Sequence, residues 1–182
     1  LTYRDATAAD VDDVVALVES AYRGDASRAG WCTEADLLDG QRVDTEMVGA
    51  TIADDGATVL LAHAGDALVG CCELRRGSEG GPATLGMFAV DPTLQAGGIG
   101  RCVLDAGLAL AAERWGAERV EITVIDVRHA LIDWYRRRGF VPTGEHRPFP
   151  YGDERYGIPR RDDLRFVVME APVTGRAAGP GQ

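Results

Sequence analysis

The sequence lacks the features that most directly indicate a metal, membrane or nucleic-acid function. Its four cysteines show no Cys-x-x-Cys spacing with partnered histidines, so no metal site is expected. No apolar run approaches the roughly 20 residues of a membrane span, and the N-terminus shows neither a basic region nor an apolar signal segment. The formal net charge of −10 argues against nonspecific binding to a phosphate backbone. We therefore expect a cytoplasmic protein with no metal, membrane or nucleic-acid partner.

The composition is that of one compact domain. The chain has 182 residues, of which 46% are hydrophobic, enough to bury a sizeable core without disulfides or metals. We expect a single domain over residues 1–171. Residues 172–182 turn to Pro, Gly and Ala without periodicity and predict a loose tail. The sequence leaves the oligomeric state open, including a homodimer.

The most informative stretch is the glycine-rich run Gln95-Ala96-Gly97-Gly98-Ile99-Gly100-Arg101. It follows a predicted strand over residues 85–90 and precedes a predicted helix over residues 102–113. Glycines let the backbone turn tightly and aim several N–H groups at one anion on the helix N-terminus. The run thus predicts a phosphate-binding loop, and the alternative is an ordinary strand-to-helix turn.

Residues that the loop lacks argue against several classes of phosphate ligand. A nucleotide-triphosphate loop needs a Lys followed by Ser or Thr, and Arg101-Cys102 offers neither. A dinucleotide loop needs a third small residue where this chain has Val103. ATP, GTP, NAD and FAD are therefore disfavoured.

The remaining pattern, Gln-x-x-Gly-x-Gly, resembles the pyrophosphate loop of the GCN5-related N-acetyltransferase (GNAT) superfamily, which binds acetyl-coenzyme A. A second match follows downstream: a strand over residues 120–125, then a helix holding Tyr135, which Gly139-Phe140 follows four residues later. The resemblance covers roughly residues 2–170. It implies an α/β fold whose mixed, mostly antiparallel central sheet is flanked by helices and splays to admit the cofactor arm.

The resemblance also implies which residues bind acetyl-CoA. Backbone groups of Phe88, Ala89 and Val90 would bond the pantetheine amides, although plain core packing also explains the first and last of these. Backbone N–H groups from Ala96 to Arg101 would hold the pyrophosphate, with side-chain contacts from Gln95 and Arg101. The full predicted set is Phe88, Ala89, Val90, Gln95, Ala96, Gly97, Gly98, Ile99, Gly100 and Arg101.

The implied reaction is direct transfer, in which an amine attacks the thioester and passes through a tetrahedral intermediate. By this resemblance, Tyr135 occupies the position of the family's tyrosine acid, which protonates the leaving sulfur. The alternative interpretation is that Tyr135 is an aromatic residue that packs on a helix face. The resemblance does not supply a general base. The histone-acetylating branch of the family has a Glu as its base, and this chain has Thr84 at that position. Glu73, Glu121 or a water chain remain as alternatives. Arg128 stands where the family often has an Asn, and His129 is a weak base candidate.

The acceptor is the least determined part. One set of acidic residues favours a polyamine or other cationic amine, although all of them also fit solvated caps and helix faces: Glu19, Asp25, Glu34, Asp36 and Asp39. One set of arginines favours an amino acid: Arg147, Arg155, Arg160 and Arg161. Three aromatics, Phe149, Tyr151 and Tyr156, would form a lid or tether a loop. We expect N-acetylation of a small primary amine; a peptide or protein acetyltransferase and a non-catalytic acyl-CoA sensor are the alternatives.

The remaining elements follow from periodicity and turn signals. The patterns predict a first strand over residues 1–4, helices over residues 8–22 and 44–53, and a helical turn over residues 33–38. A hairpin is predicted around Gly65-Asp66, and a last strand over residues 164–169.

Overall fold

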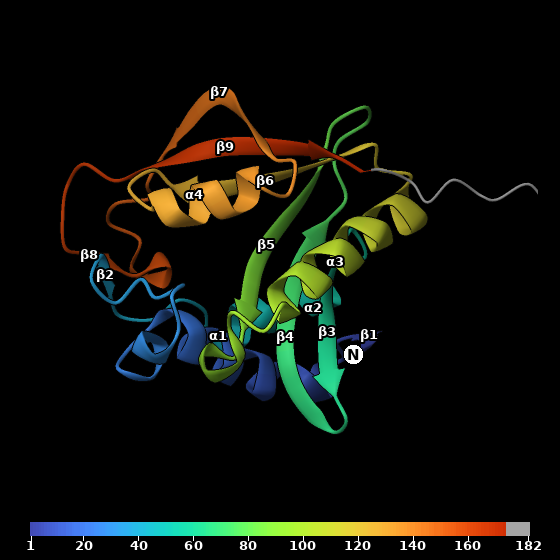
Figure 1. The fold of residues 1–182 in the computed structure, drawn as a ribbon, viewed down its shortest axis with the longest axis horizontal. Helices are drawn as coiled ribbons and strands as arrows, with labels where there is room; N and C mark the ends of the chain where they lie inside the picture. Colours follow the sequence, from blue (N-terminus) through green and yellow to red (C-terminus); the bar gives the residue numbers. More distant parts are fainter. Residues whose placement is uncertain (174–182) are drawn as a thin grey trace, which may run out of the picture.

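The structure, a computed structural model, describes residues 1–173 and is built on a seven-stranded sheet (Figure 1). The strand order is β1-β3-β4-β5-β6-β9-β7, and only β5 and β6 pair in parallel. The strands are β1 (Thr2–Asp5), β3 (Ala57–Ala64), β4 (Ala67–Arg75), β5 (Ala83–Val90), β6 (Arg119–Ile125), β7 (Val141–Pro148) and β9 (Arg165–Pro172). A separate two-stranded sheet joins β2 (Leu38–Asp39) to β8 (Ile158–Pro159). The predicted mixed, mostly antiparallel α/β fold is confirmed.

Helices cover both faces of the sheet. The α-helices are α1 (Val11–Tyr22), α2 (Thr45–Ala53), α3 (Ile99–Trp115) and α4 (His129–Arg136). Figure 1 shows α3 and α4 on one face, with α1 and α2 on the other. The adjacent cysteines of β4 mark the two layers, because Cys71 packs in the core under α1 and α2 while Cys72 packs under α3. This agrees with the alternation of side chains along a strand.

Local signals explain several boundaries. Asp44 caps α2 by accepting a hydrogen bond from the Met47 N–H at 2.8 Å. Gly65 adopts a φ of +61° in the tight turn between β3 and β4. The first helix starts later than predicted, since a short 3₁₀ helix, η1 (Ala8–Asp10), precedes α1. Within residues 1–173, no helix is both long and apolar enough to cross a membrane.

The C-terminal third departs most from the sequence prediction. β7 was not predicted, because this edge strand is largely exposed, contains Pro142 and Gly144, and shows no apolar alternation. The predicted helical turn over residues 33–38 ends instead in β2, whose partner β8 lies about 120 residues further along the chain. Pro172, which the sequence assigned to the tail, belongs to β9, and residues 174–182 of the predicted tail lie outside the described part.

Candidate active site

The strands β5 and β6 lie side by side only where they begin. Ala83 pairs with Val120 and Thr84 with Glu121, and the register contains no later pair within residues 1–173. Figure 1 shows β5 turning away from β6 beyond this point. β5 also carries a bulge opposite β4, where Met87 adopts a φ of +42°. The rest of β5 therefore turns an unpaired backbone edge toward the gap, which is the splay that the resemblance to the GNAT superfamily implied.

A cavity of about 310 Å³ opens beside this gap. The end of β5, the glycine loop, α4 and the segment after α1 supply its walls. Most of the predicted cofactor-binding residues line it, namely Phe88, Ala89, Val90, Gln95, Ala96, Gly98, Gly100 and Arg101. Gly97 and Ile99 belong to the same loop but do not line the cavity.

The glycine loop forms the N-terminus of α3. Ala96 and Gly98 both have positive φ, +71° and +86°, so the backbone turns sharply twice before the helix begins. The first intrahelical acceptor is the Gly98 carbonyl, which receives the Cys102 N–H at 3.2 Å. The N–H groups of Ile99, Gly100 and Arg101 precede that bond and have no carbonyl within the helix. Together with the helix dipole, they form a site suited to an anion.

The Gln95 side chain braces the cavity wall. Its Oε1 accepts hydrogen bonds from the Trp31 N–H at 2.9 Å and the Cys32 N–H at 3.3 Å. Its Nε2 donates to the Val90 carbonyl at 3.1 Å. A Cβ at Gly30 would lie 2.5 Å from this Oε1, so a larger residue there would displace the Gln95 side chain. Gln95 thus joins the loop after α1 to the end of β5.

Aromatic rings form the inner wall of this cavity. The Trp134 ring lies 5.9 Å from Phe88 and 6.2 Å from Trp31, measured between centroids. Arg138 stacks over Trp134 at 3.5 Å and donates a 2.8 Å hydrogen bond to its carbonyl. Arg101, in contrast, is mostly exposed and lies 3.5 Å from Asp105. The wall is apolar inside and cationic at its rim.

A second cavity, of about 260 Å³, lies between the splayed strands and is lined by residues 85–88 of β5 and residues 122–125 of β6. Tyr22, Phe88 and Leu131 line both cavities, so the two meet at these side chains. Tyr135 lines only the second cavity and is buried. Its hydroxyl makes no hydrogen bond to the part of the chain that the structure describes, and burial raises its pKa well above the usual value. The phenol therefore stays protonated at neutral pH and is free to donate.

Tyr22 was not singled out from the sequence, although it lines both cavities. Its hydroxyl donates a hydrogen bond to the Phe88 carbonyl at the β5 bulge, and burial raises its pKa. Because no motif marks the last residue of α1, only the packing of α1 against β5 identifies this contact.

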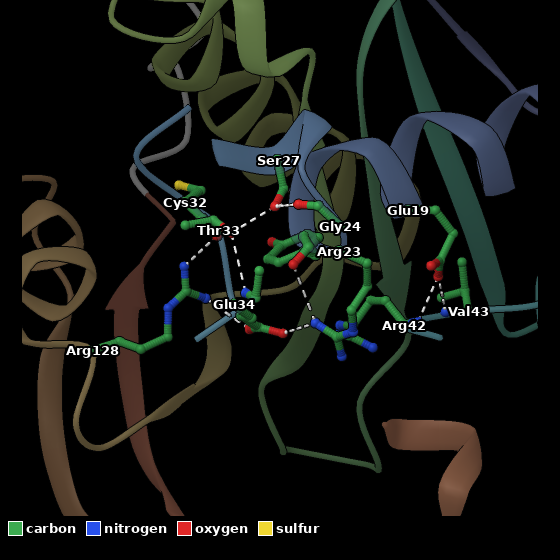
Figure 2. A network of polar contacts seen from close by, with 12 residues as sticks. Glu19, Arg23, Gly24, Ser27, Cys32, Thr33, Glu34, Arg42, Val43 and Arg128 are labelled. Carbon is green, nitrogen blue, oxygen red and sulfur yellow. Dashed lines mark hydrogen bonds and ion pairs between the residues drawn. The ribbon is translucent and has the colours of Figure 1, made fainter. Parts of the chain in front are cut away.

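A buried ion network holds the segment over residues 32–38, whose Glu34 and Leu38 line the second cavity (Figure 2). Glu34 lies between two guanidinium groups, with Arg23 Nη1 at 2.7 Å and Arg128 Nη1 at 2.8 Å. Burial alone would raise the pKa of Glu34, but Arg128, Arg42 and Arg23 hold it below its ordinary value. Arg128 also donates to the Cys32 carbonyl at 2.6 Å. The Asn position of the family thus holds an arginine that anchors this segment.

Both predicted carboxylate bases are engaged. Glu73 pairs with Arg75, and Glu121 receives two hydrogen bonds from Arg147, at 2.6 and 3.0 Å. Neither lines either cavity. His129 begins α4 and is exposed.

The charged sets predicted to select the acceptor are also internally paired. Arg28 pairs with Asp25 and Asp36, and Glu19 accepts from the Arg42 and Val43 N–H groups. The four arginines of the C-terminal segment pair with nearby carboxylates: Arg147 with Glu121 and Glu145, Arg155 with Asp153, Arg160 with Asp39, and Arg161 with Asp163. Neither set faces a cavity as free charge.

The aromatic residues of the C-terminal segment divide between two roles. Phe149 and Tyr156 line the second cavity. Tyr151 instead accepts the Leu164 N–H at 2.6 Å and fixes the loop before β9.

Comparison with known proteins gives a consistent result. The family model "Acetyltransferase (GNAT) family" matches residues 18–140. A mycothiol acetyltransferase from Clavibacter sepedonicus is 37% identical over 135 residues, covering 74% of this chain and 40% of that protein. A mycothiol acetyltransferase from Salinispora tropica is 33% identical over 66 residues, covering 36% of this chain and 22% of that protein. The chain thus spans less than half the length of these curated relatives.

Solved structures share the fold. The ribosomal-protein-S18-alanine N-acetyltransferase from Escherichia coli superposes with a TM-score of 0.68 at 15% identity, covering 100% of this chain and 99% of that one. A ribosomal-protein-alanine N-acetyltransferase from Brucella melitensis gives 0.67 at 22% identity, covering 94% and 99%. The glycine loop, the splayed strands and the family match agree, and the chain belongs to the GNAT acetyltransferase family.

Proposed function

We propose that this protein is an acetyl-CoA-dependent N-acetyltransferase acting on the primary amine of a small molecule. The observation that carries the proposal is the pair of cavities that meet at the splayed strands through Tyr22, Phe88 and Leu131. One cavity ends at an anion-binding helix N-terminus, and the other contains a protonated phenol. This arrangement provides separate sites for a phosphorylated donor and an amine acceptor.

The first cavity fits acetyl-CoA. The free N–H groups at the start of α3 suit its pyrophosphate, and a Cβ at Gly98 would meet nothing within 4 Å, so the loop is open to a ligand. The unpaired edge of β5 offers backbone donors and acceptors to the amides of the pantetheine arm. When bound, acetyl-CoA supplies an activated acetyl group and a thiolate leaving group.

The residues around the gap favour direct transfer to the amine. A bond forms between the amine nitrogen and the acetyl carbon, the carbon–sulfur bond breaks, and Tyr135 gives its proton to the departing sulfur. Cys32 lines the first cavity, but burial raises the pKa of its thiol to about 11, which argues against an acetyl-cysteine step. With Glu73 and Glu121 paired to arginines, we propose that water carries the amine proton to solvent.

A small acceptor is favoured by the cover over the second cavity. β2 and β8 pair through Leu38 with Pro159 and Asp39 with Ile158, and the Arg160 N–H donates to the Leu37 carbonyl at 2.9 Å. Asp39 and Arg160 add an ion pair at 2.5 Å. Two segments distant in sequence are thereby joined over a cavity of about 260 Å³, whereas a peptide acceptor is better served by an open groove.

The names of the relatives include both small-molecule and protein acetyltransferases. The sequence relatives carry the name mycothiol acetyltransferase, and the structural neighbours include ribosomal-protein alanine and spermidine N-acetyltransferases. The peptide acetyltransferase and the acyl-CoA sensor therefore remain the alternatives to be tested. We propose residues 1–171 as the acetyltransferase domain.

Two measurements test this function. Calorimetric titration with acetyl-CoA, coenzyme A and ATP should show binding of both coenzyme A forms and not of ATP. Thiol release from acetyl-CoA should then appear with a pool of small amines and not with a pool of peptides. Release only with peptides would favour the peptide acetyltransferase, and binding without release in any pool would favour the sensor.

A further inference from the structure

The second cavity contains one charged side chain that forms no ion pair within residues 1–173. Three charged residues line it: Glu34, Arg42 and Arg128. Glu34 and Arg128 pair with each other, and the buried Arg23 occupies the other oxygen of Glu34. Arg42 has no ion pair and donates no side-chain hydrogen bond within residues 1–173. Its charge helps to lower the pKa of Glu34, yet its guanidinium keeps its hydrogen-bond donors available to a ligand in the cavity.

The backbone of Arg42 is fixed although its guanidinium is free. The carboxylate of Glu19 accepts the N–H groups of Arg42 and Val43, the latter at 2.8 Å, and Val43 is buried beside α1 (Figure 2). The Arg42 guanidinium lies 5.6 Å from the centre of the Tyr22 ring, one of the side chains shared by both cavities. The cation is thus held near the place where the cavities meet.

The charge balance at this site opposes that of the whole chain. Glu34 and Glu19 carry two negative charges against the positive charges of Arg23, Arg42 and Arg128, which leaves a local excess of one positive charge. The chain as a whole has a formal net charge of −10. A cationic polyamine would meet repulsion here, whereas an anionic group would be attracted. The remaining lining is largely apolar and suits an apolar body; its aromatic members are Tyr22, Phe88, Tyr135, Phe149, Tyr156 and Phe166.

We propose that the acceptor is a small amine that also carries a carboxylate, with an apolar or aromatic body, and that Arg42 recognises the carboxylate. This rests on the proposed acetyltransferase function. The guanidinium fork forms paired hydrogen bonds with a carboxylate, which places the amine at a set distance from it, toward Tyr135. The substrate class is therefore that of free amino acids, and Arg42 is the specificity-determining residue.

Matched acceptors test the proposal. Thiol release from acetyl-CoA is measured with phenylalanine, its carboxamide and its decarboxylated amine, and with the corresponding leucine series. We expect kcat/KM to be at least about tenfold higher for the carboxylates, since a hydrogen-bonded charge pair of this kind contributes that much or more. In the Arg42→Gln variant this preference should disappear through a rise in KM, with the decarboxylated amines little changed.

Arg161→Gln is the matched control. It removes the same charge from an exposed residue that pairs with Asp163 and lines neither cavity, so it should keep the preference. Equal kcat/KM for an amino acid and its decarboxylated amine, or an Arg42→Gln variant that keeps the preference, would overturn the proposal while leaving the acetyltransferase function intact.

If none of the acceptors is acetylated, a binding measurement tests the carboxylate site instead. Calorimetry with N-acetylphenylalanine and its methylamide, in the presence of coenzyme A, should show about tenfold tighter binding of the carboxylate to the wild type but not to Arg42→Gln. Equal affinities would overturn the carboxylate site. Failure of coenzyme A itself to bind would instead overturn the proposed function.

Discussion

A substitution at Gly98 tests the proposed acetyl-CoA site most directly. In Gly98→Glu, a side chain and a negative charge enter the proposed pyrophosphate site at a φ of +86°. We expect the affinity for acetyl-CoA to fall by about a hundredfold or more, because a like charge replaces a free anion site. Isothermal titration calorimetry measures this change.

Gly116→Glu provides the matched control for that variant. Gly116 also has a positive φ, +63°, and an added Cβ there meets nothing within 4 Å, but it ends α3 far along the chain from the loop. Both variants carry the same kind of backbone strain, so a similar loss of stability is expected. If both bound acetyl-CoA equally well, the glycine loop would have no part in the site.

The Tyr135 hydroxyl is tested by Tyr135→Phe. Because this hydroxyl makes no hydrogen bond within residues 1–173, the variant should keep its stability and its affinity for acetyl-CoA. Turnover should fall by about a hundredfold, the lower range for a positioned general acid. Steady-state kinetics with calorimetry separates the two effects, and unchanged kcat would leave Tyr135 a packing role only.

The pH profile of the wild type gives an independent readout of the same residue. Burial raises the Tyr135 pKa above 10, so the acid keeps its proton up to that pH. We expect kcat to show no decline between pH 7 and 9.5. A fall within this range would mean that a different group, with a lower pKa, gives the proton.

At the scale of elements, the Glu34 network joins the end of α1, the segment before β2 and the start of α4. Replacing Glu34 with Gln leaves two buried guanidinium groups without their counter-ion. We expect a loss of about 3 kcal/mol or more in the free energy of unfolding, typical of a broken buried ion pair. Urea denaturation measures the loss.

Asp36→Asn is the control for Glu34→Gln. Asp36 lies two positions after Glu34 in the same segment. It pairs with Arg28, but both side chains are largely exposed. Exposed pairs contribute little to stability because solvent screens them, so this variant should be close to the wild type. Equal losses in the two variants would show that the buried network does not hold the segment.

For the whole molecule, buried neutral groups set an alkaline limit to stability. Burial raises the pKa of Cys71 to about 12 and that of Cys32 to about 11, while an unfolded thiol titrates near 9. Their folded pKa is raised, so the stability they contribute is complete below pH 9 and is lost as the pH rises through the folded pKa. Each such group contributes a slope of about 1.4 kcal/mol per pH unit within that window.

Urea denaturation at pH 8, 9.5 and 10.5 measures this limit. The Cys71→Ala variant should show a shallower fall than the wild type, although it is less stable at pH 8 because it leaves a cavity. A free energy of unfolding that stays constant from pH 8 to 10.5 would contradict the prediction.

The sequence determined the parts of this protein that depend on local order. The run from Gln95 to Arg101 predicted a phosphate loop because a strand precedes it and a helix follows it, and Tyr135 with Gly139-Phe140 extended the resemblance to the whole fold. Cap and turn residues such as Asp44 and Gly65 set their own boundaries. These signals act over a few residues, so the chain order alone carries them.

Only the tertiary structure decided the chemistry of the acceptor site. The sequence singled out nine charged residues for the acceptor, but nearly all are paired by partners that folding brings to them, such as Asp39 and Arg160 across 121 positions. Arg42 carries no motif, and its proposed role rests on its position in the cavity wall and on its lack of an ion pair within residues 1–173. The physical reason is that charge at a site is a sum over neighbours in space. Which carboxylates neutralise which guanidinium groups is fixed only when the sheet and its covering segments come together.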